Sequence, residues 1–205
     1  MTQIKNILFD FGNILFLWNP KNFIKEYFFD DPRGMDLHFS DKGSELWRGY
    51  NRGIITFKEL IDSYNEITGI NKTKLKIYIK EFLPKKIAPL DGAFELINQL
   101  KDNNYKLYGL TDNFPNFIEY FYKNYKDISS KFSDIIISYN AKSLKPEKVI
   151  YQYLLTTNNI IPEETIFFDD IEKNISTAKE FGINAYQANG PKEVKDILLK
   201  LNLIK

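Results

Sequence analysis

The chain has 205 residues, enough for one α/β domain with an inserted subdomain. Hydrophobic residues make up 43% and aromatic residues 16%, which supplies a sizeable core and excludes a globally disordered chain. Because 28 Lys and Arg balance 27 Asp and Glu, the net charge of +1 gives no reason to expect a nucleic acid as partner.

The lack of cysteine excludes disulfides, zinc–thiolate sites and cysteine nucleophiles. The single histidine, His38, excludes a multi-histidine metal site, and we expect it to be a surface or satisfied polar residue. No apolar run approaches the roughly 18 residues of a membrane span. Asp10 and Asn13 interrupt the apolar N-terminal stretch, so it lacks the layout of a signal peptide. We therefore expect a soluble, cytoplasmic protein without a membrane partner.

The first predicted element is a short apolar strand over residues 4–9, which ends at Asp10 and is followed by a turn at Gly12. From about residue 16 to 88 the patterns are helical. Helix signals there are Asn19-Pro20 at one start, the capping box Thr56 and Glu59 at another, and Leu75, Ile79 and Phe82 along a third helix. These signals predict a helical cap inserted after the first strand.

From residue 89 onward, strand and helix patterns alternate. Apolar strands are predicted over 106–110, 134–138, 165–168 and 183–186. Helix signals between them are Asp91 as an N-cap, Pro146 at a first helical position, and Ile171, Ile175, Ala178 and Phe181 on one face before Gly182. This alternation predicts an α/β fold with a Rossmann-like parallel sheet flanked by helices. We expect a core domain of residues 1–15 and 89–205 and a cap of residues 16–88.

Polar side chains follow each of the first four predicted strands. They are Asp10 after the first strand, Thr111, Asp112 and Asn113 after the second, Lys145 in the loop after the third, and Asp169 and Asp170 after the fourth. Because the carboxyl ends of parallel strands share one edge of a sheet, where ligands bind, we expect these side chains to converge.

The expected group has the composition that phosphoryl transfer needs. Closely grouped carboxylates repel one another, and a bound cation with oxygen ligands, such as Mg²⁺, relieves that repulsion. A lysine offsets phosphate charge, a hydroxyl holds phosphate oxygens, and one carboxylate can attack phosphorus in line. Each residue taken alone is as readily a turn, cap or surface residue. The shared edge and the order of all four positions favour a site.

These segments resemble the four motifs of the haloacid dehalogenase-like hydrolases. They read Ile-Leu-Phe-Asp10-Phe-Gly12-Asn13, Leu-Thr111-Asp112-Asn113, Ser143-Leu144-Lys145-Pro146-Glu147 and Phe167-Phe168-Asp169-Asp170. The resemblance spans the whole chain, and the insertion lies where that family carries a helical cap. It is greatest to the branch that contains α-glucose-1-phosphate phosphatase and the N-terminal phosphatase domain of soluble epoxide hydrolase.

The resemblance implies a Mg²⁺-dependent phosphatase acting on a small phosphate monoester, with sugar phosphates among the candidates. Asp10 would attack phosphorus to form an aspartyl phosphate, assisted by Lys145. The implied metal ligands are Asp10, the Gly12 carbonyl, Asp170 directly and Asp169 through water, with the last two roles interchangeable. The implied phosphate-binding residues are Thr111, Asp112, Asn113 and Lys145.

Gly12 departs from the family pattern, because most phosphatases of the superfamily carry a second Asp there as general acid and base. Such help contributes roughly 10²–10⁴-fold to the rate. The alternative function is therefore a slow or non-catalytic phosphate-binding or regulatory protein. Dehalogenase chemistry is disfavoured because the Asp169–Asp170 pair favours a metal. A signalling receiver domain is disfavoured because its acidic pair would come first among the site residues, whereas Asp169 and Asp170 come last. Trp47, Arg48 and Arg52 are candidate substrate-facing residues of the cap, although core packing is the commoner role of a tryptophan and solvent exposure that of an arginine.

Overall fold

Five short apolar segments pair into one parallel sheet in the computed structural model, which describes residues 3–205. The strands are β1 (Asn6–Phe9), β2 (Lys106–Thr111), β3 (Phe132–Ile137), β4 (Thr165–Asp169) and β5 (Asn184–Gln187), in the order β3-β2-β1-β4-β5. The chain runs outward from β1 to β3 and then returns to the other side of β1. β1 and β4 therefore flank the switch point of the sheet, as the predicted Rossmann-like fold requires.

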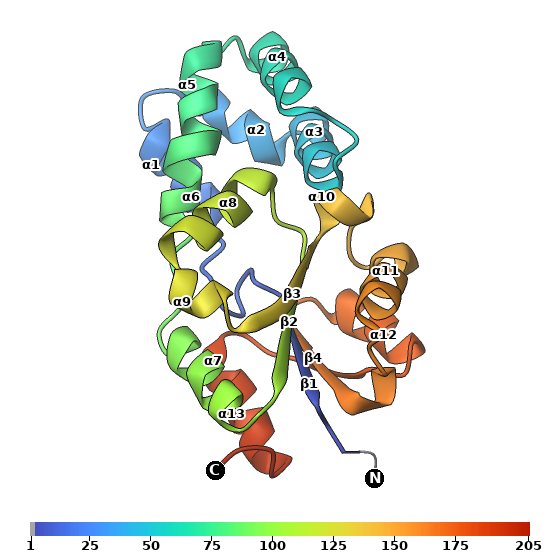
Figure 1. Ribbon diagram of the computed structural model, residues 1–205. Helices are drawn as coiled ribbons and strands as arrows, with labels where there is room; N and C mark the ends of the chain where they lie inside the picture. Colours follow the sequence, from blue (N-terminus) through green and yellow to red (C-terminus); the bar gives the residue numbers. More distant parts are fainter. Residues whose placement is uncertain (1–2) are drawn as a thin grey trace.

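The alternation of side chains along each strand divides the apolar residues between two faces. Leu8 and Phe167 pack on one face beneath α11 (Lys148–Asn158) and α12 (Glu172–Glu180). Ile7, Phe9 and Phe168 face the opposite layer. That layer consists of α7 (Ala93–Asp102), α8 (Pro115–Asn124), α9 (Lys126–Ser129) and α13 (Pro191–Lys200) (Figure 1). Covering both faces leaves only the strand ends open to a ligand.

A separate layer of helices lies beyond the carboxyl ends of the strands (Figure 1). It comprises α1 (Pro20–Tyr27), a 3₁₀ turn (Pro32–Met35), α2 (Asp36–Phe39), α3 (Asp41–Arg52), α4 (Phe57–Thr68), α5 (Lys72–Ile77), a π-helix (Tyr78–Phe82) and α6 (Leu83–Lys86). Its entry and exit run side by side, because Leu17 N donates to Ala88 O and Leu90 N to Leu15 O, both at 2.9 Å. From this connection we propose that residues 16–88 form a cap on a core of residues 1–15 and 89–205.

Two helices begin with the N-terminal capping residues predicted from the sequence. Asn19 accepts a bond from Asn22 N ahead of α1, and Thr56 and Glu59 form the complete capping box of α4. The third predicted cap helix is less regular than expected, since its middle, Tyr78–Phe82, is π-helical. No helix among residues 3–205 is long and apolar enough to cross a membrane.

Two other predicted helix starts are wrong. The helix after residue 89 begins at Ala93, because Gly92 adopts a left-handed conformation (φ 80°) that separates Asp91 from it. Pro146 does not begin a helix. It follows a cis peptide bond in a turn that Glu147 N closes onto Leu144 O, and α11 begins only at Lys148. This turn presents Lys145 to the strand ends.

Candidate active site

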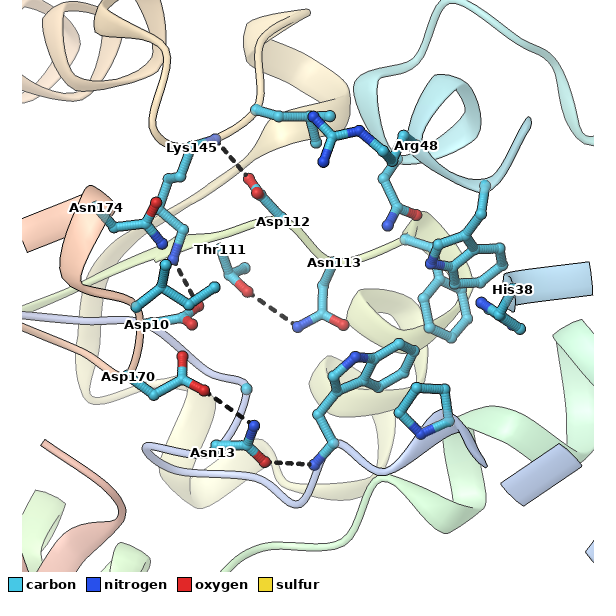
Figure 2. A pocket seen from close by; sticks show the side chains of 18 of the residues that line it. Asp10, Asn13, His38, Arg48, Thr111, Asp112, Asn113, Lys145, Asp170 and Asn174 are labelled. Atoms are coloured by element: carbon cyan, nitrogen blue, oxygen red, sulfur yellow. Dashed lines mark hydrogen bonds and ion pairs between the residues drawn. The ribbon is translucent and has the colours of Figure 1, made fainter. Parts of the chain in front are cut away.

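The ends of β1, β2 and β4 meet beneath the cap around a cavity of about 360 Å³ (Figure 2). Among the residues singled out from the sequence, those that line it are Asp10, Gly12, Thr111, Asp112, Asn113, Lys145 and Asp170. Asp169 is fully buried directly behind them. The parallel sheet thus brings together residues from both ends of the chain.

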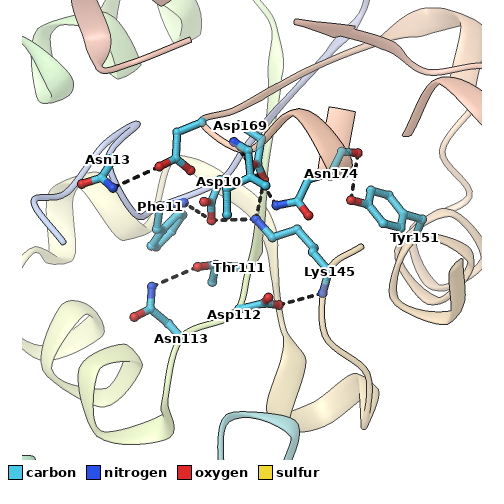
Figure 3. Close-up of polar contacts among 12 residues, drawn as sticks. Asp10, Phe11, Asn13, Thr111, Asp112, Asn113, Lys145, Tyr151, Asp169 and Asn174 are labelled. Carbon is cyan, nitrogen blue, oxygen red and sulfur yellow. Dashed lines mark hydrogen bonds and ion pairs between the residues drawn. The ribbon is translucent and has the colours of Figure 1, made fainter. Parts of the chain in front are cut away.

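Lys145 lies at the centre of this group (Figure 3). Its Nζ is 2.8 Å from Asp10 Oδ1 and 2.6 Å from Asp169 Oδ2, and its side chain is almost fully buried. Burial alone would lower the pKa of Lys145, but Asp10, Asp169 and Asp112 outweigh it and raise that pKa. Asp112 Oδ1 also accepts the backbone N–H of Lys145 at 3.1 Å. The lysine is therefore charged and held at both its backbone and its ammonium group.

The carboxylate of Asp10 is buried at the cavity floor. Its Oδ1 accepts the backbone N–H of Phe11 at 2.7 Å as well as Lys145. Burial raises the pKa of Asp10 to about 7, with Lys145 opposing the rise and Asp169 adding to it. The pKa of Asp112 is raised to about 6, also chiefly by burial. A cation at this position would favour the ionised carboxylates.

One oxygen atom from each of Asp10, Asp169 and Asp170 lies within 4.8 Å of the others, a spacing that suits one metal ion. The two adjacent aspartates differ in how their oxygens are used. Asp169 Oδ1 accepts from Asn174 Nδ2 at 2.8 Å and from the backbone of Ile171 at 2.9 Å, while its Oδ2 accepts from Lys145. Both oxygens of Asp169 are thus engaged by the protein.

Asp170 is only half-buried, and its carboxylate accepts from a single side chain, while Gln187 Nε2 donates to its backbone oxygen at 2.9 Å. Its Oδ2 accepts from Asn13 Nδ2 at 3.0 Å, which leaves Oδ1 at the cavity. Within residues 3–205, no hydrogen bond is made to the carbonyl oxygen of Gly12. Asn13 was not assigned a role from the sequence, yet it fixes Asp170 and also accepts from Trp18 N at 3.1 Å. The available ligand atoms therefore belong to Asp10, Gly12 and Asp170.

The opposite side of the floor carries uncharged donors. Thr111 ends β2 and is buried, and its Oγ1 accepts from Asn113 Nδ2 at 2.9 Å. Asp112 lies between them, but its carboxylate is turned to the backbone of Lys145. Thr111 and Asn113 thus present a hydroxyl and an amide toward the cavity, beside the charged ammonium of Lys145.

Position 12 has room for a side chain. A Cβ on Gly12 would lie 3.6 Å from Trp18 Cβ and 3.9 Å from Asp10 Oδ2, which are ordinary contacts. Gly12 is absent from the residues with positive φ, so its backbone conformation is open to L residues. Both the space and the backbone at position 12 therefore admit an aspartate side chain.

The sequence pattern of the haloacid dehalogenase-like hydrolase family matches residues 39–188. The chain belongs to this family. The predicted resemblance is confirmed, and the receiver-domain alternative is wrong.

Two relatives of this haloacid dehalogenase-like hydrolase are phosphatases by name. The chain is 26% identical to D-ribitol-5-phosphate phosphatase of Bacteroides thetaiotaomicron over 98% of its own length and all of the relative. It is 24% identical to a sesquiterpene phosphatase of Aspergillus oryzae, with 89% and 88% of the two chains covered. A solved haloacid dehalogenase family enzyme from B. thetaiotaomicron, in complex with magnesium and inorganic phosphate, is 26% identical over 90% of this chain and 93% of that one, with a TM-score of 0.73.

The cap of this haloacid dehalogenase-like hydrolase places aromatic rings over the cavity. Trp47 is buried, lies nearly parallel to Trp18 with centroids 6.4 Å apart, and contacts Phe114. Arg48 is exposed but lines the same cavity. His38 also lines it, half-buried beside Trp47, so the expectation of a surface or satisfied polar residue is wrong. Pairing of aromatic surfaces within the cap accounts for this burial.

Arg52 does not line the cavity, and the expectation that it faces substrate is wrong. It forms an ion pair with Glu147 of the core. Residues beside it also reach the core. Tyr50 OH donates to Asn116 Oδ1 at 2.9 Å, Ser138 Oγ donates to Asn51 O at 2.8 Å, and Lys142 Nζ donates to Gly53 O at 2.7 Å. Residues 50–53, which we call the latch, therefore fasten the end of α3 to the core.

Weakening the latch is expected to affect substrate affinity more than folding. In Arg52→Ala the loss of a half-exposed ion pair should raise the KM of a phosphate ester about two- to fivefold, with little change in the melting temperature. The matched control is Lys58→Ala, which removes an exposed ion pair with Asp62 inside the cap. Equal KM values for the two variants, measured in steady-state kinetics, would show that the ion pair does not contribute to closure.

Proposed function

We propose that the protein is a Mg²⁺-dependent phosphatase that transfers the phosphoryl group of a small phosphate monoester to Asp10 and then to water. The observation that carries this proposal is the position of Asp10. Its carboxylate contacts the ammonium of Lys145 and belongs to the acidic cluster with Asp169 and Asp170, on the floor of the cavity. The phosphatase names of two relatives, and the magnesium and phosphate in the complex of the solved family enzyme, support the same reaction.

The side chains fit Mg²⁺, because they offer hard oxygen ligands with excess negative charge. Asp10, the carbonyl of Gly12 and Asp170 would hold the ion directly. Asp169, whose oxygens accept from Lys145 and Asn174, would not bind the ion directly but would hold Lys145 in place behind the metal ligands. When bound, the ion offsets the negative charge of the carboxylates and the phosphate.

The chain itself supplies the nucleophile and the phosphate-binding groups. Asp10 forms a bond to phosphorus as the bond from phosphorus to the ester oxygen breaks, and the departing alkoxide takes a proton from water because Gly12 supplies no acid. Lys145 favours the ionised form of Asp10 and faces the phosphate with its charge. Thr111 and Asn113 donate to phosphate oxygens, and Asp112 contributes its backbone N–H because its carboxylate would repel the phosphate. Attack of water on phosphorus then releases phosphate and restores Asp10.

Removal of the metal should abolish hydrolysis. With excess chelator, hydrolysis of p-nitrophenyl phosphate is expected to fall to background and to return when Mg²⁺ is added. Asp170→Asn should raise the Mg²⁺ concentration for half-maximal activity by about tenfold or more, because it neutralises a direct ligand. Glu172→Gln, an exposed acidic residue outside the cluster, is the matched control and should leave that concentration unchanged. Full activity in the presence of chelator would contradict the proposed metal.

The absence of a side chain at Gly12 favours one alternative, a phosphate-binding protein without appreciable turnover. A panel of aryl and alkyl phosphates measured with Mg²⁺ separates the two functions. Binding of inorganic phosphate without hydrolysis of any ester would favour the alternative, whereas multiple turnovers on an aryl phosphate would exclude it.

A further inference from the structure

Buried polar atoms without a hydrogen-bond partner gather on the cap side of the cavity. Among residues 3–205, the side-chain atoms of this kind are His38 Nε2, Asn51 Oδ1 and Tyr78 OH. His38 and Asn51 both line the cavity that holds Asp10. Because folded proteins satisfy nearly all buried polar groups, two such atoms in one cavity indicate a polar occupant.

The walls around these two residues are mainly aromatic. Trp18, Trp47, Phe39 and Phe114 line the same cavity. Aromatic faces of this kind bind the C–H surface of an organic group and leave its polar atoms to be bound elsewhere. The cap side therefore combines an apolar wall with a small number of placed hydrogen-bonding groups.

The two hydrogen-bonding groups are uncharged. Asn51 carries an amide, and burial lowers the pKa of His38 to about 3, so its imidazole is neutral. Neutral groups in a desolvated position suit hydroxyl groups, which both donate and accept. They do not provide the charge that a second phosphate or a carboxylate would require at that position.

The latch fixes the backbone of Asn51. Its carbonyl oxygen accepts from Ser138 Oγ of the core at 2.8 Å, while its side chain stays buried at the cavity. The amide is thus held in place over the floor when the cap is fastened. His38, carried by α2, contacts Trp47 of α3 with ring centroids 4.5 Å apart.

We propose that Asn51 and His38 form a hydroxyl-binding subsite that selects phosphate esters with a polyhydroxylated aliphatic leaving group. The proposal rests on the phosphatase activity proposed above and names its substrate class. The phosphate lies at Asp10 and Lys145, and the carbon chain extends toward the cap between the aromatic walls. Hydroxyl groups on that chain supply the partners that Asn51 Oδ1 and His38 Nε2 lack.

An apolar leaving group of the same length would leave both atoms buried and unpaired. A site built to bind a hydroxyl discriminates strongly against an analogue without it, because its own polar group loses its partner. Each unpaired group is expected to reduce kcat/KM roughly 10–100-fold. The subsite therefore disfavours prenyl-like and simple alkyl phosphates.

The test compares a pentitol phosphate with n-pentyl phosphate, two alkyl esters of equal chain length. For the wild-type protein with Mg²⁺, the ratio of kcat/KM for the pentitol ester over the pentyl ester is expected to exceed about 100. Asn51→Leu and His38→Phe, which remove the polar atoms but keep the bulk, should each reduce this ratio at least about tenfold. Asn51→Ala repeats the test without added bulk, and thermal unfolding checks that each variant is folded.

Ser44→Ala is the matched control, because Ser44 lines the cavity but its hydroxyl already donates to Asp41 O at 2.9 Å. It should leave the ratio within about twofold. A wild-type ratio near one, or an equal ratio in the folded Asn51 and His38 variants, would overturn the subsite. Failure of the wild-type protein to hydrolyse the pentitol ester, the pentyl ester and p-nitrophenyl phosphate alike would instead overturn the proposed function, so the two failures are distinguishable.

Discussion

Replacing Asp10 with asparagine is expected to lower kcat/KM for any phosphate monoester by at least about 10⁴-fold. The amide is a poor nucleophile and a weak ligand for Mg²⁺. The variant should stay folded, because an amide oxygen can still accept from Phe11 N and Lys145, as Oδ1 of Asp10 does. Lys145 also retains Asp169 at 2.6 Å. Steady-state kinetics and thermal unfolding measured on the same preparation test both parts.

The matched control for this substitution is Asp112→Asn. It also removes one buried negative charge beside Lys145 and keeps an oxygen that can accept the backbone N–H of Lys145. We expect it to lower kcat/KM less than about tenfold, because Asp112 makes no bond to phosphorus. Similar losses in both variants would show that net charge, rather than nucleophilic attack, explains the effect of Asp10→Asn.

Introducing an acid at position 12 is expected to raise the rate on esters with poor leaving groups. The wild-type protein lacks a side-chain acid there, so expulsion of a basic alkoxide should be its weak step, whereas aryl phosphates leave as phenolates. Gly12→Asp should increase kcat/KM for an alkyl phosphate relative to an aryl phosphate by about tenfold or more, as part of the general-acid contribution of roughly 10²–10⁴. The space 3.6 Å from Trp18 Cβ and the ordinary φ of Gly12 admit the side chain.

A control and a leaving-group series make this prediction specific. Gly12→Asn has the same bulk without a proton to donate and should leave the alkyl-to-aryl ratio near that of the wild type. Across esters of similar size, log kcat/KM of the wild-type protein should fall steeply as the leaving-group pKa rises, and less steeply in Gly12→Asp. A flat dependence in the wild type, with chemistry rate-limiting, would mean that another group donates the proton.

The cap contributes to both the proposed chemistry and the proposed selectivity. Residues 50–53 fasten α3 to the core, and Asn51 within that latch faces the cavity. Closure therefore excludes bulk water and places the hydroxyl-binding groups in the same step. Loss of the ion pair between Arg52 and Glu147 should accordingly affect polyhydroxylated esters at least as much as aryl esters.

The sheet and the residues at its active edge could be predicted from the amino-acid sequence. Apolar runs such as residues 165–168 are long enough only for buried strands, and Asp10, Thr111 and Asp169 come where those strands end. In a parallel sheet this placement brings the three side chains together, regardless of the lengths and conformations of the connecting loops. The capping box at Thr56 and Glu59 was equally predictable, because its chemistry is local.

Which atoms of these residues are available to a metal or a substrate depends on contacts made in the folded chain. The sequence treats Asp169 and Asp170 alike, but Lys145 and Asn174 engage the oxygens of one and leave the other at the cavity. Pro146 has the pattern of a helix start, yet it lies in the turn that presents Lys145. Hydrogen bonds between residues that are distant in the chain cannot be predicted from the spacing of residues within a short segment.

The roles of residues in the cap were the hardest to predict from the sequence. Asn51 and Arg52 are neighbours on one helix, and the spacing of polar residues distinguishes neither from a solvated surface. Docking of the cap on the core turns Arg52 to Glu147 and buries the amide of Asn51 over the cavity. Helical periodicity determines which face of α3 is apolar. The position of that face over the strand ends depends on contacts between α3 and the core. These contacts form only in the folded chain.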